Sequence, residues 1–119
     1  MRKLKVYHGT AANYLPSFQK RGPDLLRQRH LNDKRAFCTS KSPVEAERFA
    51  IRNTPSNDLT KCGIILEFDA SKVAKKDYCE AKDNRTMFDE KELAFFNVKK
   101  LKLIAYHRLE KGGWKRIKL

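Results

Sequence analysis

The stretch KVYHGTAANYL, residues 5–15, joins a short strand pattern to a polar turn. Apolar Val6 alternates with lysine, which predicts a strand at the start of this stretch. The strand runs into His8, Gly9 and Thr10, and a predicted helix follows. An imidazole between a strand and a glycine turn, with a hydroxyl two residues later, is typical of a surface turn or of the rim of a binding pocket.

The length of 119 residues predicts a single domain over residues 1–119, with one hydrophobic core. No apolar run approaches the roughly 20 residues that span a bilayer, and the basic N-terminal segment lacks the apolar core of a secretory signal. The odd number of cysteines (Cys38, Cys62 and Cys79) fits no zinc template. We therefore expect a reduced, cytoplasmic protein without metal or membrane, with its cysteines in the core.

The formal net charge of +13 is concentrated at the two ends of the chain. Residues 1–35 hold nine Lys/Arg against two acids, and residues 99–119 hold eight against one. The central residues 36–98 are nearly balanced, with ten basic and eleven acidic side chains. If the ends converge in the fold, they form a surface for nucleic acid, nucleotide phosphates or an acidic protein. The alternative is a charge spread over the surface that serves solubility.

The order of predicted elements is that of an α+β domain with short antiparallel strands. Pro16 predicts a short helix that ends at Gly22-Pro23. The next segment, residues 24–35, is predicted as a short helix or a mobile loop. Strands are predicted at residues 3–8, 36–40, 62–70, 92–97 and 101–109, followed by a last basic piece with Trp114. The charged residues 70–91 are predicted to be mostly loop.

The best-marked helix begins after Ser42. Ser42 and Glu45 match a capping box, and Pro43 stands at the first helical position, where a missing N–H is harmless. Apolar spacing predicts that one face of this helix carries Ala46, Phe49, Ala50 and Asn53.

Three polar segments lie next to strand ends: His8-Gly9-Thr10, Phe37-Cys38-Thr39-Ser40, and Glu92 at the start of ELAFF. Each has a structural explanation, as a surface turn, a helix cap and one more surface charge. No dinucleotide-binding G-x-G-x-x-G and no P-loop motif is present.

Taken in order along residues 4–109, these segments resemble the ADP-ribosyltransferase fold, in particular its His–Tyr–Glu branch. The resemblance rests on three segments: YHGT, an aromatic-x-Ser/Thr strand before an alanine-rich helix, and an apolar strand that begins with Glu and ends in F-N. The resemblance implies split antiparallel β-sheets with flanking helices, and NAD as the substrate.

The resemblance also implies roles for individual residues. His8 would hydrogen-bond the adenosine-side ribose of NAD, Gly9 would contact the nicotinamide amide through its backbone, and Thr10 would be an accessory hydroxyl. Glu92 would bind the nicotinamide ribose and stabilise the oxocarbenium-like centre as nicotinamide leaves.

The middle motif departs from the family pattern, because Cys38 stands where the family has a tyrosine that stacks on nicotinamide. Phe37 would supply the stacking face only through a one-residue shift, which reverses the face of the strand that a side chain occupies. Thr39 and Ser40 are similar to the Ser-Thr-Ser element of arginine-specific relatives. All four residues are therefore expected at the NAD site.

The function implied is mono-ADP-ribosyl transfer from NAD to a protein or a nucleic acid, as in toxin, phage or effector proteins delivered into a host cell. An antitoxin or inhibitor is then an expected partner. The alternative is a catalytically degenerate, basic module of the same fold that binds nucleic acid. A third interpretation, removal of an RNA 2′-phosphate, depends on Arg29, His30 and Arg35.

Overall fold

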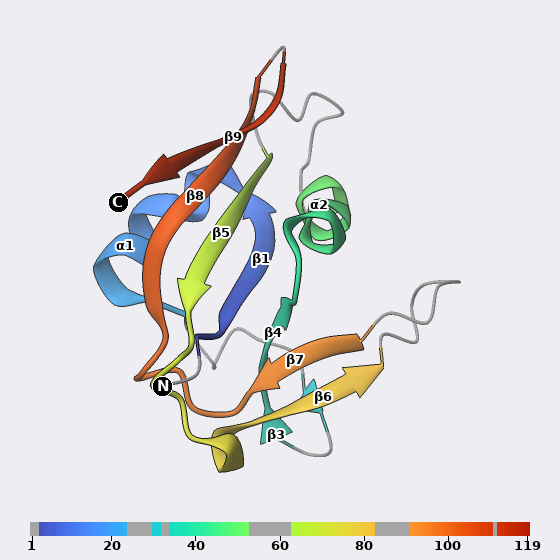
Figure 1. The fold of residues 1–119 in the computed structure, drawn as a ribbon, viewed down its shortest axis with the longest axis vertical. Coiled ribbons are helices and arrows are strands. Elements are labelled where there is room, and N and C mark those ends of the chain that lie inside the picture. Colours follow the sequence, from blue (N-terminus) through green and yellow to red (C-terminus); the bar gives the residue numbers. More distant parts are fainter. Residues whose placement is uncertain (1–2, 24–29, 32–33, 53–62, 83–90, 111) are drawn as a thin grey trace.

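In the part of the chain that the structure describes, seven antiparallel strands form one sheet, in the order β6-β7-β4-β1-β5-β8-β9 (Figure 1). The computed structural model describes residues 3–23, 30–31, 34–52, 63–82, 91–110 and 112–119. The sheet strands are β1 (Lys5–Ala11), β4 (Phe37–Ser40), β5 (Gly63–Asp69), β6 (Tyr78–Lys82), β7 (Lys91–Phe95), β8 (Lys102–Glu110) and β9 (Gly113–Lys118). The predicted α+β class with antiparallel strands is confirmed.

Strand β5 lies at the centre of the longer half of the sheet, between β1 and β8. Six of its seven residues are buried, because both faces of the sheet are covered at this strand. The prediction of a central strand from the sequence CGIILEFDA is confirmed, although the run also contains a buried acid, Glu67.

The two helices cover opposite faces of the sheet (Figure 1). On one face, α1 (Leu15–Arg21) packs against the main core through Leu15 and Phe18. The buried members of this core are Val6, Phe37, Ile64, Leu66, Phe68, Ala70, Val73, Leu93, Phe95 and Leu101. On the other face, α2 (Pro43–Arg52) buries Ala46 and Ala50 against Ile65.

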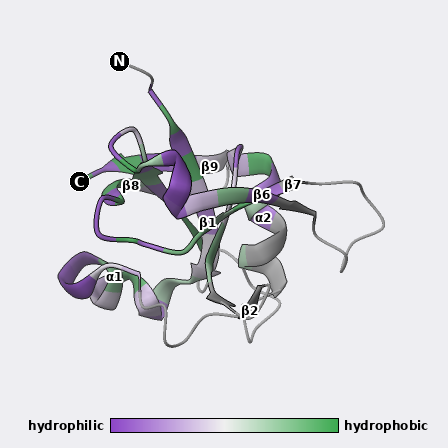
Figure 2. Cartoon of the chain, turned by 90° about the horizontal axis from the view of Figure 1, so that it is seen from below, coloured by the Kyte–Doolittle hydropathy of each residue, from purple (hydrophilic) through white to green (hydrophobic). Residues whose placement is uncertain are grey.

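Helix α1 begins and ends where its sequence predicts. Pro16 occupies its first turn, and Gly22 ends it with a φ of +72° while its N–H donates to the Phe18 carbonyl (2.9 Å). The C-terminal end of the helix is strongly hydrophilic (purple in Figure 2), in keeping with the exposed Lys20 and Arg21. Within the described ranges, no helix has the length and apolar character needed to cross a membrane.

Helix α2 is capped as the sequence predicts. Pro43 is its first residue, and the Glu45 N–H donates to Ser42 Oγ (3.3 Å). Ala46 and Ala50 face the sheet and are fully buried. The predicted partners of this face, the Phe49 side chain and Asn53, lie outside what the structure describes.

Three segments differ from their predictions. The turn predicted at His8-Gly9-Thr10 is instead part of β1, paired residue by residue with β5. Residues 70–91 were expected to be mostly loop, yet β6 is an edge strand in full register with β7. Its five residues are too few for a clear alternation, so the partner strand rather than the local pattern determines its conformation. In the segment 24–35, β2 (His30–Leu31) pairs with β3 (Lys34–Arg35), whereas residues 24–29 and 32–33 lie outside the described part.

Both basic ends of the chain belong to the same half of the sheet. Strand β1 lies on one side of β5, and the β8–β9 hairpin, which turns at Gly113 (φ +111°), lies on the other. The sheet therefore brings together the basic β8–β9 hairpin and β1, which carries one (Lys5) of the nine Lys/Arg of residues 1–35.

We expect Ser42→Ala to lower the free energy of unfolding by about 1 kcal/mol, because the Glu45 N–H loses its acceptor. Ser17→Ala, an exposed change within α1, is the matched control and should leave stability nearly unchanged. Urea denaturation of both variants measures the difference, and an equal effect of the two changes would contradict the capping role.

Candidate functional site

The three polar segments selected from the sequence lie on three adjacent strands, β1, β4 and β7. Tyr7 on β1 is directly opposite Ser40 on β4, and Ser40 is directly opposite Glu92 on β7. Residues directly opposite each other in antiparallel strands share a face of the sheet. Tyr7, Ser40 and Glu92 therefore form one row on the face that α2 covers.

Strands β1 and β4 are joined through a single register pair, Tyr7 with Ser40. Beyond this pair the imidazole of His8 connects the two strands, since its Nδ1–H donates to the Cys38 carbonyl (2.9 Å). With the proton on Nδ1, Nε2 is the acceptor atom of the neutral ring. His8 thus joins the two halves of the sheet next to the pair at which they meet.

The His8 ring lies in an aromatic cluster on the α1 face. Its centroid is 4.5 Å from that of Phe37 and 5.8 Å from that of Phe18. Burial lowers the pKa of His8 to about 4, and the hydrogen bond to the Cys38 carbonyl opposes this shift only in part. His8 is therefore neutral at physiological pH, as a hydrogen-bonding role requires.

Glu92 is 2% exposed and stands in register between Ser40 on β4 and Ala81 on β6. Its position in the row places its side chain on the α2 face, opposite to the face that His8 occupies. The strand register therefore separates His8 from Glu92, although they lie only two strands apart.

The remaining predicted residues divide between the two faces. Register places Gly9, Cys38 and Ser40 on the α2 face with Glu92. Phe37 is fully buried in the core of the α1 face, and Thr39 on the same face donates its hydroxyl to the Leu93 carbonyl (2.9 Å). Thr10 is also buried on the α1 face, in register with Ile64.

Sequence reasoning missed a buried carboxylate, Glu67, which is 2% exposed in the middle of β5. The guanidinium of Arg116 donates to both of its oxygens, from Nε to Oε1 (3.1 Å) and from Nη2 to Oε2 (2.8 Å). His107 Nε2 lies 3.0 Å from Oε1, and Lys5 Nζ lies 3.7 Å from Oε2. Strands β1, β8 and β9 thus each supply one partner to the carboxylate of β5.

The hydrogen bonds from Arg116 lower the pKa of Glu67 to about 2, and His107 and Lys5 act in the same direction while burial opposes them. The signal in the sequence is one acid inside an otherwise apolar strand, because a buried carboxylate needs partners. The identity of those partners depends on strand pairing, which the local sequence does not give.

Tyr7 lies in the row between Ser40 and Glu67, so it separates the two buried carboxylates of the α2 face. Burial, followed by the negative charge of Glu67, raises the pKa of its hydroxyl, and Arg116 opposes the change. Its ring meets His107 edge-on, with the centroids 6.0 Å apart. The α2 face thus combines buried acids with hydroxyl groups, an arrangement suited to stabilising positive charge.

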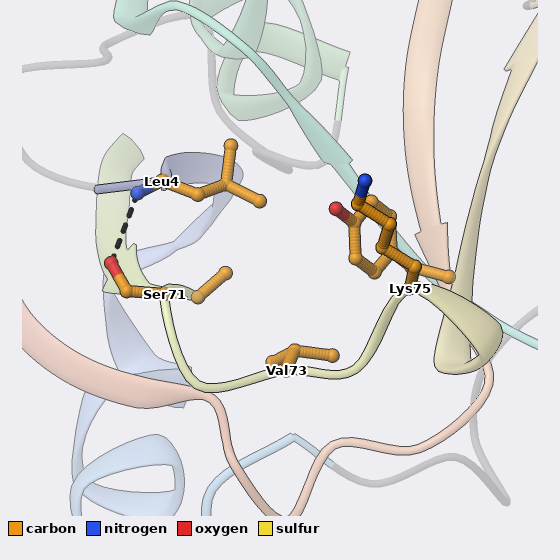
Figure 3. A pocket seen from close by; sticks show the side chains of 6 residues that line it. Leu4, Ser71, Val73 and Lys75 are labelled. Atoms are coloured by element: carbon orange, nitrogen blue, oxygen red, sulfur yellow. Dashed lines mark hydrogen bonds between the residues drawn. The ribbon is translucent and has the colours of Figure 1, made fainter. Parts of the chain in front are cut away.

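A cavity of about 290 Å³ lies elsewhere, beside the start of β1 and the turn after β5 (Figure 3). Its lining residues are Leu4, Ala70, Ser71, Val73, Lys75 and Tyr78. The Leu4 N–H donates to Ser71 Oγ (3.0 Å) at its edge. None of the residues predicted for NAD binding lines this cavity.

Comparison of the chain with protein-family models, curated proteins and solved structures gives no match. The roles of Glu92, Glu67 and His8 are therefore inferred from motif, register and local chemistry.

We expect the stability of the wild-type protein to decrease as the pH falls from about 6.5, the ordinary pKa of histidine, to about 4. Over this range the unfolded chain binds a proton at His8 that the folded protein does not. The variant His8→Gln should lose less stability over the same window, in denaturant titrations at several pH values. Parallel curves for the two proteins would contradict the buried, neutral state of His8.

The carboxylate of Glu67 should also make the stability of the protein fall as the pH falls, but over a lower pH range. Its stabilising contribution is complete above pH 4.5 and is lost as the pH falls toward about 2. We expect Glu67→Gln to reduce the free energy of unfolding by about 1.5–3 kcal/mol at pH 7, and the difference from wild type to shrink with acid. Glu110→Gln, at the edge of the hairpin, is the control. An equal effect of the two changes would show that Glu67 has no special role.

Proposed function

We propose that this protein is a mono-ADP-ribosyltransferase that cleaves NAD and transfers ADP-ribose to a macromolecular acceptor. One observation carries the proposal: the three motif segments occupy adjacent strands, and a buried Glu92 stands in register with Ser40 of the middle motif. Chance similarity of three short segments would not require them to be neighbours in the sheet.

The resemblance implies split sheets, whereas these seven strands form one continuous sheet that is narrowest between β1 and β4. Strands β6, β7 and β4 extend to the lower right in Figure 1, away from β5, β8 and β9. The two groups meet at the single pair Tyr7–Ser40. The candidate residues Ser40 and Glu92 lie at or beside this junction.

In the proposed reaction Glu92 is the catalytic carboxylate. The bond between nicotinamide and ribose breaks, its electron pair passes to the nicotinamide ring nitrogen, and positive charge develops on the ribose. A fixed carboxylate in a site with little water stabilises that charge. The nucleophile of the acceptor then forms the new bond to the ribose carbon.

The neighbours of Glu92 on the α2 face would bind the dinucleotide. Gly9 allows close approach of NAD to the backbone of β1, and Ser40 offers a hydroxyl. Cys38 provides no aromatic surface, and Phe37 does not replace it there because it is buried on the opposite face. We therefore expect weaker NAD binding than a stacking tyrosine would give.

The predicted role of His8 at the ribose does not fit a dinucleotide bound beside Glu92, because the register places its ring on the α1 face. Its Nδ1–H donates to the Cys38 carbonyl and so connects β1 to β4. We propose that this hydrogen bond from His8 to the Cys38 carbonyl holds β4, which carries the middle motif, in place beside β1.

We expect Glu92→Gln to reduce nicotinamide release and label transfer from radiolabelled NAD by 100-fold or more. Glu80→Gln, an exposed acid on neighbouring β6, is the matched control and should retain activity. NAD-induced thermal shifts of both variants report whether NAD binding survives. Undiminished turnover by Glu92→Gln, or no turnover by the wild type with protein and nucleic-acid acceptors, would overturn the proposal.

A further inference from the structure

We propose that the part of the α2 face formed by β1, β8 and β9 binds the phosphate backbone of nucleic acid. Four cations, Lys5, Lys102, Arg116 and Lys118, form what we call the basic face. Lys5 and Lys102 flank Asp69 in one row of the register, and Lys118 and Arg116 belong to the two rows that follow. Residues more than one hundred positions apart in sequence are thereby assembled on one surface.

The charges of the basic face are arranged in two levels. The carboxylate of Glu67 is buried beneath it, and that of Asp69 accepts a hydrogen bond from the Ser71 N–H (2.9 Å). The cations stand outside, with 52% of the Lys5 side chain and 42% of the Arg116 side chain exposed. A ligand that approaches from solvent therefore meets these cations, with Glu67 buried beneath them and the partly exposed Asp69 among them.

Arg116 is held in a fixed orientation for such a ligand. Two of its five N–H donors bind Glu67, from Nε and Nη2, so the guanidinium plane is fixed before any ligand arrives. A preorganised guanidinium loses less conformational entropy when it binds a phosphate. Glu67 thus prepares the basic face as well as joining its strands.

The aromatic residues indicate what kind of binding to expect. Trp114 packs against Ala46, Ala50 and Ile65 and is therefore part of the smaller core. The described part of the basic face offers no stacking platform, so we expect contacts to phosphates and binding with little sequence preference.

The basic face is continuous with the proposed catalytic row. Glu92 lies two strands from β1, a separation of about 10 Å at the usual strand spacing. A nucleic acid bound along Lys5 would therefore pass close to Glu92 and could serve as the acceptor. That acceptor role rests on the proposed function, whereas binding by the basic face does not.

The test compares two triple variants with the same change in net charge. The first, Lys5→Gln/Lys102→Gln/Lys118→Gln, alters the basic face, and the control, Lys20→Gln/Lys75→Gln/Lys76→Gln, alters exposed lysines elsewhere. Fluorescence anisotropy with a labelled single-stranded 15-nucleotide oligomer measures Kd over a range of salt concentrations. We expect the first variant to bind about 10- to 100-fold more weakly, with a salt slope smaller by about 2.

Equal weakening in both triple variants would show a diffuse charge effect and overturn the proposal. Tighter binding of polyglutamate than of the oligomer would also overturn it, in favour of an acidic protein partner. Oligomer binding by Glu92→Gln separates the two proposals: if that variant binds normally but retains NAD turnover, the catalytic proposal fails and the basic face stands. If NAD turnover depends on Glu92 while no oligomer binds, the basic face fails alone.

Discussion

The hydrogen bonds between Glu67 and Arg116 fix the longer half of the sheet. An isolated carboxylate in the middle of β5 would be strongly destabilising, and cationic and hydrogen-bonding partners remove that cost. Because one partner lies on each of β1, β8 and β9, satisfying the carboxylate requires all three strands in one register. A slip of one residue in any of them would turn its partner residue to the wrong face. The same carboxylate then sets the orientation of Arg116 at the surface.

The shorter half of the sheet is attached more weakly, and that attachment lies at the candidate site. Main-chain register joins β1 and β4 at one pair, and the His8–Cys38 hydrogen bond adds a side-chain connection beside it. The buried hydroxyl of Thr39 secures β4 to β7 on the far side. Glu92 therefore belongs to a rigid three-strand unit whose relation to β1 depends on few contacts. The candidate site therefore lies at the boundary where the two halves of the sheet have the fewest connections.

Local sequence signals predicted most of the helices and strands. The features that were not predicted depend on the pairing of strands that are distant in sequence. Pro16, Gly22 and Ser42 mark helix ends through chemistry confined to a few residues, and each acts as expected. Strand β6 was missed because its conformation depends on β7. For the site, the motifs selected the three segments, whereas their adjacency in the sheet and the faces they occupy follow from the pairing and register of β1, β4 and β7. That register places His8 and Glu92 on opposite sides, and it explains why the partners of Glu67 could not be named beforehand.

The wide sequence separation of Glu67 and Arg116 also affects how the chain assembles during synthesis. Arg116 follows Glu67 by 49 residues, which a ribosome adds in roughly 2–10 s. During that interval β5 has been made, but its carboxylate lacks the partner that allows burial in the finished sheet. We therefore expect β5 to be buried stably only after β9 has been made. The sheet is in this way complete only when the hairpin is complete. A chain truncated before Arg116 should therefore fail to form the stable sheet.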